Sequence, residues 1–280
     1  MKMHGCGNDF IVVDDRQRLW DFDADAVSFL CDRHFGIGAD GIILVRPATT
    51  PEADLLMHYI NADGSLAEMC GNGVRVFAKY VSDREMVEGD VVRVQTPSGV
   101  KRVEVSRGED GSVILARVDM GEPVLAAAAI PTTLPGDPVV ERPLSTTAGD
   151  FVLTCVSMGN PHAIMWVDDV ERAPVETVGS IVETDAAFPR KTNVEFAQVV
   201  GPDRIRLRVW ERGVGETLAC GTGACATLVA GVLTGKTGCQ ATIELPGGDL
   251  FIEWPGHGPV MMSGPAEEVF EGVWPIPDEE

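Results

Sequence analysis

The chain has 280 residues, 45% of them hydrophobic, so it has enough apolar surface for a large core and is not an intrinsically disordered chain. Its formal net charge is −21, from 43 acidic and 22 basic residues. A surface of that sign repels phosphate backbones, which argues against nucleic acid as a partner.

The cysteine content and the apolar runs indicate a compartment. The seven cysteines include no Cys-x-x-Cys pair, and the first residues do not resemble a secretory leader. The longest apolar runs are far shorter than the ~18–20 residues that cross a bilayer. We therefore expect a cytoplasmic protein with reduced thiols and no membrane partner.

In the first half, apolar runs and alternation predict a series of strands interrupted by two helices. The first helix is expected over residues 24–35, with Ala26, Phe29, Leu30 and His34 on one side. The second begins after Gly73 and runs for about three turns. The strands are expected at 10–14, 41–45, 55–60, 91–95, 100–105 and 113–118.

The second half repeats this order, with strands before and after one helix that ends near Gly235. The Pro- and Ala-rich residues 121–143 are expected to cross between the halves. We predict domains over 1–118 and 119–264, with 265–280 packing back on the first. The strands are expected at 151–156, 163–167, 194–200, 205–210, 241–245 and 250–254.

One string, Cys-Gly-x-Gly, occurs in both halves, beginning at Cys70 and at Cys220, and each copy opens a predicted helix. Exposed N–H groups and the positive dipole end at a helix start favour a thiolate there. The glycines leave backbone amides bare, as a carboxylate ligand requires. Two such cysteines in matching places suggest two acid/base groups that face one another.

Such a pair of thiols suits the inversion of an amino-acid α-carbon. A thiolate can remove the weakly acidic α-hydrogen from one face while a thiol returns a proton to the other, without a cofactor. Amides aimed at the neighbouring carboxylate stabilise the enediolate-like intermediate. The alternative is that both strings are helix caps with buried cysteines. The remaining cysteines are expected to be small buried apolar residues: Cys6, Cys31, Cys155, Cys225 and Cys239.

Three other patterns resemble functional motifs but lack the context that the motifs need. Residues 36–41 match Gly-x-Gly-x-x-Gly, yet here a helix precedes the loop and a strand follows it, the reverse of a dinucleotide site. Gly235-Lys236-Thr237 resembles the end of a P-loop, but it ends a helix. Cys220 and Cys225 lack metal-ligand spacing, so no metal is expected.

Taken together, the motifs resemble diaminopimelate epimerases over nearly the whole chain. Several segments appear in the family's order, including Gly7-Asn8-Asp9-Phe10, Asn61-Ala62-Asp63-Gly64-Ser65, Glu68-Met69-Cys70-Gly71-Asn72-Gly73, Ser157-Met158-Gly159-Asn160-Pro161-His162, Asn193-Val194-Glu195-Phe196, Trp210-Glu211-Arg212-Gly213 and Ala219-Cys220-Gly221-Thr222-Gly223.

The resemblance implies an α+β fold of two pseudo-repeated domains. Each would wrap a mostly antiparallel or mixed sheet around a central helix, with the active site in the cleft between them. It implies interconversion of LL- and meso-2,6-diaminoheptanedioate in lysine and peptidoglycan precursor synthesis. The family uses no cofactor or metal and is usually homodimeric.

Carried over by position, Cys70 and Cys220 would be the two acid/base thiols. Arg212 would pair with the distal carboxylate, a task suited to guanidinium. Glu211 would bind an amino group and, with His162, help set the thiol pKa values. The other substrate-binding positions would be Asn8, Asn61, Asn160 and Asn193, with helix-start amides from Gly71, Asn72, Gly221 and Thr222.

Two departures and three alternatives accompany the resemblance. Gly41 stands where some family members have glutamine, and Cys6 stands where leucine is frequent.

Proline racemases and hydroxyproline epimerases share the thiol pair, but Arg212 beside four asparagines argues for a second amino-acid head on the substrate. Isomerases related to phenazine synthesis lack the cysteine pair. A non-catalytic amino-acid-binding protein would bind the substrate without exchanging its α-hydrogen.

Overall fold

The computed structural model describes residues 1–67 and 70–275. The chain forms two compact units. Unit 1 is Met1–Ala116 together with the segment that begins at Pro265, and unit 2 is Arg117–Gly264. Glu68 and Met69, which belong to the family motif before Cys70, lie outside the described residues, as do 276–280. Each unit is described by itself.

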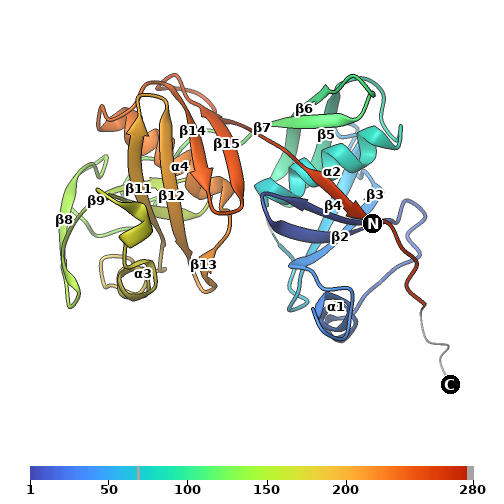
Figure 1. The fold of residues 1–280 in the computed structure, drawn as a ribbon, viewed down its shortest axis with the longest axis horizontal. Coiled ribbons are helices and arrows are strands. Elements are labelled where there is room, and N and C mark those ends of the chain that lie inside the picture. The colour runs from blue at the N-terminus through green and yellow to red at the C-terminus, as the bar shows by residue number, and fades with distance from the viewer. Residues whose placement is uncertain (68–69, 276–280) are drawn as a thin grey trace. The chain divides into compact units, whose positions relative to one another are not determined.

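Unit 1 is a curved mixed sheet around one helix (Figure 1). Its strands pair in the order β17–β1–β2–β3–β4–β5–β6. The β2–β3 and β4–β5 pairs are parallel, and the others are antiparallel. The elements are β1 (Lys2–Gly5), β2 (Asn8–Asp14), α1 (Ala24–Cys31), β3 (Gly41–Pro47), β4 (Leu55–Asn61), α2 (Gly71–Asp83), β5 (Val91–Thr96), β6 (Gly99–Arg107) and β17 (Glu267–Phe270). Strand β7 (Val113–Asp119) begins in unit 1 and ends in unit 2.

Helix α2 is the centre of unit 1. Val74 and Phe77 are fully buried, and the helix is covered on its other sides too. Lys79 is only 8% exposed, and its Nζ donates to Asp83 at 2.7 Å and to the Val113 carbonyl at 2.6 Å. A helix buried all round cannot slide or rotate freely, so its first turn is held in a fixed place in the unit.

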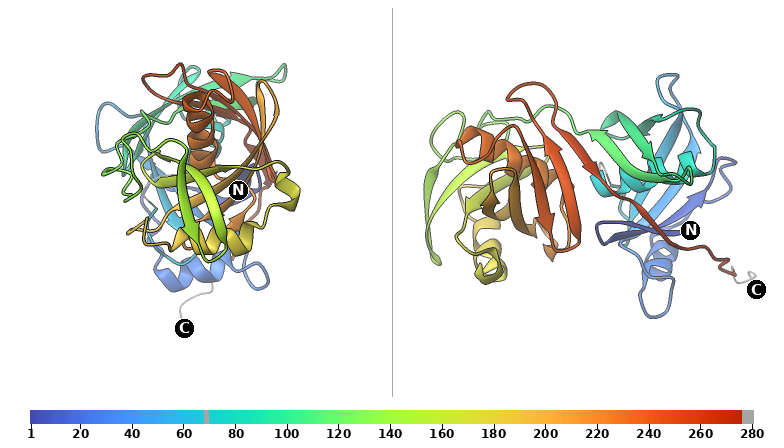
Figure 2. Two further views of the ribbon diagram at one scale, coloured as in Figure 1. Left: turned by 90° about the vertical axis from the view of Figure 1, so that its left-hand side faces the viewer. Right: turned by 45° about the horizontal axis from the view of Figure 1, so that its top comes forward.

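Unit 2 has the same plan, with α4 inside the curve of its strands (Figure 2). Its pairing order is β8–β9–β10–β11–β12–β14–β15–β16, with β13 also on β12. The elements are β8 (Arg142–Thr146), β9 (Gly149–Ser157), β10 (Pro161–Trp166), η1 (Val170–Arg172), α3 (Val175–Glu183), β11 (Asn193–Gly201), β12 (Arg204–Glu211), β13 (Gly215–Thr217), α4 (Gly221–Leu233), β14 (Gln240–Leu245), β15 (Gly248–Glu253) and β16 (Met261–Gly264).

The strand registers show that the two units repeat one topology. In unit 1, β2 runs parallel to β3, β3 antiparallel to β4, and β4 parallel to β5. In unit 2 the same relations join β10, β11, β12 and β14. The central helix follows β4 in unit 1 and the β12–β13 hairpin in unit 2. The predicted α+β class with repeated halves is confirmed.

Several local predictions were wrong. Helix α1 ends at Cys31, because Asp32 leaves the helical conformation, and its buried residues are Val27 and Cys31 while Phe29 is 49% exposed. Residues 121–143 do not cross between the units. They belong to unit 2, where Ile130 and Val139 are fully buried in its core.

Neither helix α3 nor the exposure of Cys239 was predicted from the sequence. The α3 segment contains Gly179, which weakens helix propensity. The glycine is needed because a Cβ there would lie 2.6 Å from the Trp210 side chain. Cys239 is exposed rather than buried, whereas Cys6, Cys31, Cys155 and Cys225 are buried as predicted.

Candidate functional site

Cys70 is the N-cap residue of α2, and its side chain completes the helix start. Its Sγ accepts a hydrogen bond from the Gly73 backbone N–H at 3.3 Å. Gly71 and Asn72 are the first helical residues, and both are buried. The first amides of a helix have no partner within the helix, so this turn offers N–H groups and a positive dipole end to an anion.

The groups around Cys70 form what we call the Cys70 half-site. The thiol donates to Asn8 Oδ1 at 3.6 Å, and the Asn72 side-chain amide donates to the same oxygen at 3.3 Å. Asn8 Nδ2 is held by Asp40 Oδ2 at 2.7 Å. Asn61 lies at the end of β4, where its Nδ2 donates to Ser65 Oγ at 3.0 Å. Thus Asn8 contacts both Cys70 and Asn72, while Asn61 is bonded within its own turn.

Gly41 pairs with Asn61 across β3 and β4, at the edge of this half-site. A Cβ at Gly41 would lie 2.4 Å from the Ile60 carbonyl oxygen and 2.6 Å from the Tyr59 ring. This backbone therefore has no room for the glutamine found there in some family members. Cys6 is buried, and Arg75 Nη2 contacts its sulfur at 3.6 Å.

Cys220 caps α4 in the same way and defines the Cys220 half-site. Its Sγ accepts from the Gly223 backbone N–H at 3.4 Å and lies 3.5 Å from the Thr222 hydroxyl. Gly221 and Thr222 are the first residues of the helix. Cys220 is 5% exposed. The two predicted acid/base cysteines thus have the same capping geometry in the two units.

A hydrogen-bonded row of side chains extends from Thr222 into the core of unit 2. Asn160 Nδ2 donates to Thr222 Oγ1 at 3.3 Å, and Asn160 Oδ1 lies 3.0 Å from His162 Nε2. His162 Nδ1 lies 2.6 Å from Glu195 Oε1. His162 and Glu195 are both fully buried.

The remaining predicted residues of unit 2 surround the same strand ends. Asn193 donates to the Pro161 carbonyl at 2.8 Å and accepts from the Arg212 backbone N–H at 2.9 Å. Glu211 accepts from the Thr217 hydroxyl at 2.6 Å. The Arg212 side chain is exposed and donates to the Arg190 carbonyl at 3.3 Å. Its remaining guanidinium donors can therefore face a carboxylate in solution.

The electrostatics of Cys220 differ from the sequence-based expectation. Burial raises the pKa of Cys220 well above its usual value, and the Glu211 and Glu195 carboxylates raise it further, against the bonds from Thr222 and Gly223. Burial likewise raises the pKa of Glu211 and of Glu195. The helix start was expected to favour a thiolate. Burial therefore shifts the pKa of Cys220 toward the protonated thiol, opposite to the direction expected from the helix start.

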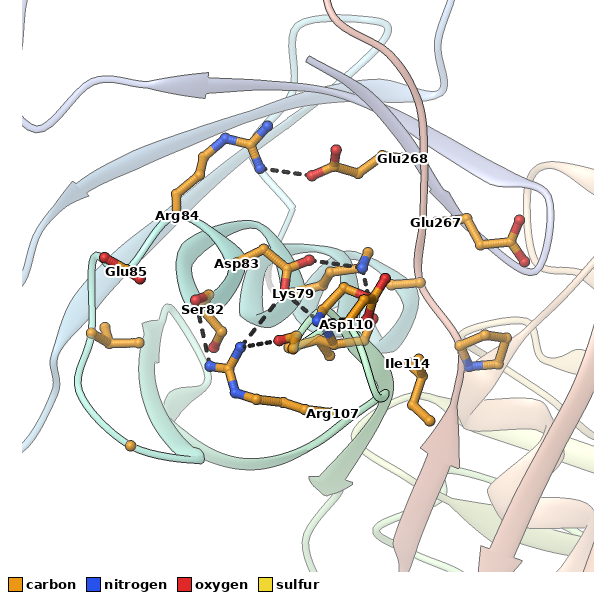
Figure 3. Close-up of a pocket in the computed structure, with 17 residues that line it drawn as sticks. Lys79, Ser82, Asp83, Arg84, Glu85, Arg107, Asp110, Ile114, Glu267 and Glu268 are labelled. Atoms are coloured by element: carbon orange, nitrogen blue, oxygen red, sulfur yellow. Dashed lines mark hydrogen bonds and ion pairs between the residues drawn. The ribbon is translucent and has the colours of Figure 1, made fainter.

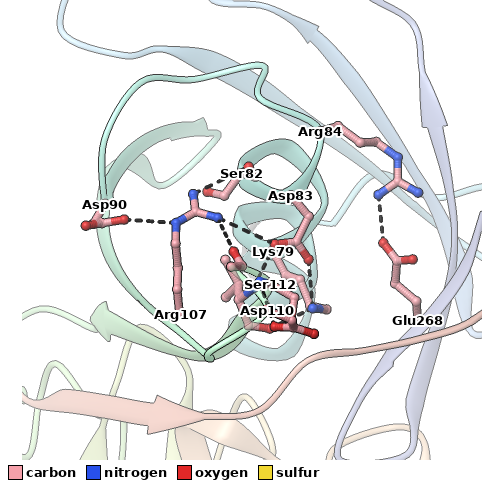
Figure 4. Close-up of polar contacts among 11 residues, drawn as sticks. Lys79, Ser82, Asp83, Arg84, Asp90, Arg107, Asp110, Ser112 and Glu268 are labelled. Carbon is pink, nitrogen blue, oxygen red and sulfur yellow. Dashed lines mark hydrogen bonds and ion pairs between the residues drawn. The ribbon is translucent and has the colours of Figure 1, made fainter.

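A large cavity of about 1080 Å³ lies elsewhere in unit 1, at the C-terminal end of α2 (Figure 3). Its cations are already paired: Lys79 with Asp83, Arg84 with Glu268, and Arg107 with Asp90 and Asp83 (Figure 4). Cys70 is at the other end of this helix, about 20 Å away at 1.5 Å per residue. The cavity is therefore separate from the Cys70 half-site.

No group of three or more His, Cys, Asp or Glu within residues 1–67 and 70–275 is arranged to hold a metal ion. Over the same residues, none of the helices combines the length and apolarity that a bilayer crossing demands.

Sequence reasoning missed three polar partners of the half-sites, namely Asp40, Thr217 and Glu195. Glu195 had a usable signal, because it lies two residues after Asn193 on a strand and therefore on the same face. It is also an acidic residue inside an otherwise apolar run. Asp40 and Thr217 are in loops or short strands, where the sequence carries no periodic pattern that predicts their contacts.

Comparison with known proteins relates this chain to one family. The family model "Diaminopimelate epimerase" matches residues 1–126 and 154–269. A diaminopimelate epimerase of Pelotomaculum thermopropionicum is 53% identical over 98% of this chain and 98% of its own length. One from Methanococcus maripaludis strain C5 is 47% identical over 97% of both chains.

Solved structures with low sequence identity have a similar fold. A probable proline racemase from Agrobacterium radiobacter K84, with bound carbonate, has a TM-score of 0.68 at 17% identity, covering 100% of this chain and 93% of its own. A hydroxyproline epimerase from Agrobacterium vitis, with bound trans-4-hydroxy-L-proline, has a TM-score of 0.66 at 15% identity, covering 96% and 88%.

Proposed function

The chain belongs to the diaminopimelate epimerase family, and we propose that it interconverts LL- and meso-2,6-diaminoheptanedioate with Cys70 and Cys220 as its two acid/base groups. One observation carries the assignment of the thiols. In both units a cysteine caps the buried central helix and receives the N–H of the second glycine of the string, at 3.3 Å and 3.4 Å.

The proposed reaction needs one thiolate and one thiol. The thiolate removes the α-hydrogen, and the thiol gives its proton to the opposite face of the same carbon. Only one of two neighbouring sulfurs would carry charge, since two thiolates would repel one another. The raised pKa of Cys220 suits the proton-donating partner in the state described here. After one turnover the roles are exchanged, so the reverse reaction uses the same pair.

The reacting carboxylate is proposed to bind at the helix starts. Amides of Gly71 and Asn72 in unit 1, and of Gly221 and Thr222 in unit 2, begin the two central helices. Negative charge that develops on this carboxylate during proton removal is stabilised by such N–H groups.

The other polar groups of the substrate have matching partners. We assign the amino and carboxylate groups of the reacting end to Asn8, Asn61, Asn160 and Asn193. Arg212 is assigned to the distal carboxylate, because its guanidinium is exposed while its backbone N–H is fixed by Asn193 at 2.9 Å. Glu211 is assigned to a substrate ammonium group, as a carboxylate between Thr217 and Cys220.

A proline racemase-type substrate is the alternative within the same fold. Proline has neither a second carboxylate nor a second amino group, so Arg212 and Glu211 would have no charged partner in its complex. The high identity to diaminopimelate epimerases over the full chain also favours the two-headed substrate.

The test is an exchange assay on purified protein in D2O without added cofactor. We expect incorporation of deuterium at the α-carbon of diaminopimelate together with inversion of that carbon, and no exchange with proline. Binding without exchange would identify a non-catalytic amino-acid-binding protein instead. The exposed Cys239 gives a matched control, since Cys239→Ser should keep full activity.

Two features of the family are proposed for this chain as well, a homodimeric state and a cytoplasmic location. Sedimentation equilibrium would give the mass in solution, against 29.9 kDa for one chain. A mass of one chain at micromolar concentration would contradict the dimer.

A further inference from the structure

The two half-sites differ at one pair of buried positions. The parallel strand registers pair Phe10 with Gly41 in unit 1 and His162 with Asn193 in unit 2. Since Asn8 and Asn160 both lie two residues earlier, Phe10 and His162 are equivalent. Two residues further along the partner strands, Ile43 and Glu195 are equivalent as well.

The glycines of the two strings confirm this equivalence independently. A Cβ at Gly73 would have the Ile43 side chain as its nearest neighbour, at 3.4 Å. A Cβ at Gly223 would have the Glu195 carboxyl oxygen, at 2.9 Å. Thus the same place beside the capping turn holds an apolar pair, Phe10 and Ile43, in one unit and a polar pair, His162 and Glu195, in the other.

The apolar version shows that the fold does not need a polar pair at these positions. All four side chains are fully buried. Burying a carboxyl and an imidazole generally lowers stability relative to well-packed apolar residues of similar size. Polar residues retained at such a cost are expected at functional sites.

The polar pair begins a continuous row of four hydrogen bonds that ends at the proposed catalytic sulfur. It runs from Glu195 to His162 at 2.6 Å, on to Asn160 at 3.0 Å, to Thr222 at 3.3 Å and to Cys220 at 3.5 Å. Every member lies in unit 2.

We propose that Glu195 is a positioning residue, which acts through His162 to fix the orientation of the Asn160 amide and hence the direction of the Thr222 hydroxyl beside Cys220. This inference rests on the proposed function of Asn160 and Cys220. It assigns a role to a carboxyl group that the reaction itself does not require.

The direction of each bond follows from donor and acceptor chemistry. Asn160 Oδ1 faces His162 Nε2, and a carbonyl oxygen only accepts, so Nε2 carries a hydrogen. Asn160 Nδ2 then donates to Thr222 Oγ1, which leaves the hydroxyl hydrogen free to point at the Cys220 sulfur. The row therefore ends on a donor, which stabilises Cys220 when it is a thiolate.

Glu195 maintains this direction by holding one hydrogen between its carboxyl and His162 Nδ1. Without the carboxyl, the neutral imidazole can move its hydrogen to Nδ1. Nε2 would then accept, the Asn160 amide would turn over, and the row would reverse. The Thr222 oxygen would then accept from Cys220 and favour the thiol.

The experiment compares Glu195→Gln with Glu195→Ile by measuring kcat and KM for diaminopimelate from pH 6 to 10. A glutamine amide can still donate to Nδ1, so Glu195→Gln should stay within about threefold of the wild type. Glu195→Ile should lower kcat/KM about tenfold or more, the size expected when the Cys220 thiolate loses its hydrogen bond from the Thr222 hydroxyl. Its acidic limb should also move to higher pH, because the thiolate loses a donor.

Other titratable groups face Glu195 and could contribute to that limb. They are His162 from β10, Cys155 from β9, Glu211 from β12 and Cys220 at the head of α4. The Gln variant leaves these four groups in place and is the matched control for the pH profile. Asp15→Asn, which changes a buried carboxyl just after β2, at the opposite end of that strand from Asn8, should leave activity unchanged.

The double variant His162→Phe/Glu195→Ile controls for a loss of folding in Glu195→Ile, because it places the apolar pair of unit 1 at both positions. It should melt at or above the temperature of Glu195→Ile and still lack activity. The inference would be overturned by wild-type kcat/KM in Glu195→Ile or by recovery of activity in the double variant. It would also be overturned if the Gln and Ile variants lost equal activity and the acidic limb did not move. A wild-type protein inactive on diaminopimelate would overturn the proposed function instead.

Discussion

Gly223 donates its backbone N–H to the sulfur of Cys220 over 3.4 Å, and a Cβ on the same glycine would lie 3.3 Å from that sulfur. The sulfur therefore also limits the size of the residue whose N–H it accepts. The equivalent glycine in unit 1, Gly73, donates to Cys70 at 3.3 Å, but a Cβ there would have ordinary contacts of 3.4 Å or more.

This difference predicts unequal effects of adding one methyl group. Gly223→Ala should destabilise the protein by about 1–3 kcal/mol, because the Cβ would lie 2.9 Å from the buried Glu195 carboxyl. Gly73→Ala should lower the free energy of unfolding by clearly less than Gly223→Ala does. Urea unfolding of both variants measures the difference, and Gly238→Ala, which has no neighbour within 4 Å, is the control. A larger loss for Gly73→Ala would contradict the described packing.

Removal of either proposed acid/base thiol should abolish net inversion. Cys70→Ala and Cys220→Ala should each lower the rate of epimerisation by about 10²–10⁴-fold, the usual contribution of a general acid or base. Circular dichroism would confirm folding, and chiral chromatography of the product would measure inversion. Full activity of the protein with both cysteines replaced would exclude the two-thiol mechanism.

Arg212 should distinguish substrates by their distal carboxylate. Arg212→Ala should lower kcat/KM for diaminopimelate about 10–100-fold, as expected for loss of a hydrogen bond to a charged group. It should have little effect on slow α-hydrogen exchange of a monocarboxylate such as lysine. Arg212→Lys should recover only part of the loss, since lysine cannot form the bidentate pair. Equal losses with both substrates would return the proline-type alternative to consideration.

If both thiols serve one α-carbon, mild oxidation should join them. We expect reversible inactivation with formation of a Cys70–Cys220 disulfide, because a disulfide forms when two cysteine Cα atoms come within about 4.4–6.8 Å. Peptide mapping by mass spectrometry before and after reduction identifies the bond. Inactivation with both thiols still free would count against a shared carbon.

The stability of the protein should depend on the buried Glu195 carboxyl with a definite sign. Burial raises the pKa of Glu195, so the folded protein keeps a proton that the unfolded chain loses near pH ~4.3. This contribution is complete below that pH and is lost as the pH rises through the folded pKa. Glu195→Gln has no proton to lose, so its free energy of unfolding relative to the wild type should increase from pH 4 to pH 8.

Asp15 provides a comparison of opposite sign. Burial acts to raise the pKa of Asp15, but the bonds from Arg46 and from the Trp20 and Leu19 amides lower it overall. Its contribution is present above pH ~3.9 and is lost in acid. Asp15→Asn should therefore be destabilised most near neutral pH, and urea titrations at several pH values would reveal the opposite slopes. Slopes of the same sign would contradict the pKa direction of the variant whose slope departs from its expected sign.

The strands and the two central helices were predictable from local pattern. Alternation and apolar runs identified β2, β3 and β4 with bounds within two residues of those observed, and the two cysteine strings marked the starts of α2 and α4. These features depend on neighbouring residues, which a sequence displays directly. The short strands β1, β8, β13, β16 and β17 carried too little periodicity to be recognised.

The candidate site was predictable as a set of residues, through the motifs that resemble one family. The family is confirmed by its model and by the relatives, whereas the roles of individual residues stay predictions. The domain boundary at residue 118 also stays a prediction.

Thus the sequence by itself determined the fold class, the two capping cysteines and the family. The tertiary structure decided which groups surround those cysteines. The row from Glu195 to Cys220 joins residues from two strands and a helix, brought together by the parallel register of β10 and β11. Burial, which no local pattern specifies, decided that the pKa of Cys220 rises rather than falls. Hydrogen-bond partners and desolvation depend on contacts between distant segments, so only the folded chain can specify them.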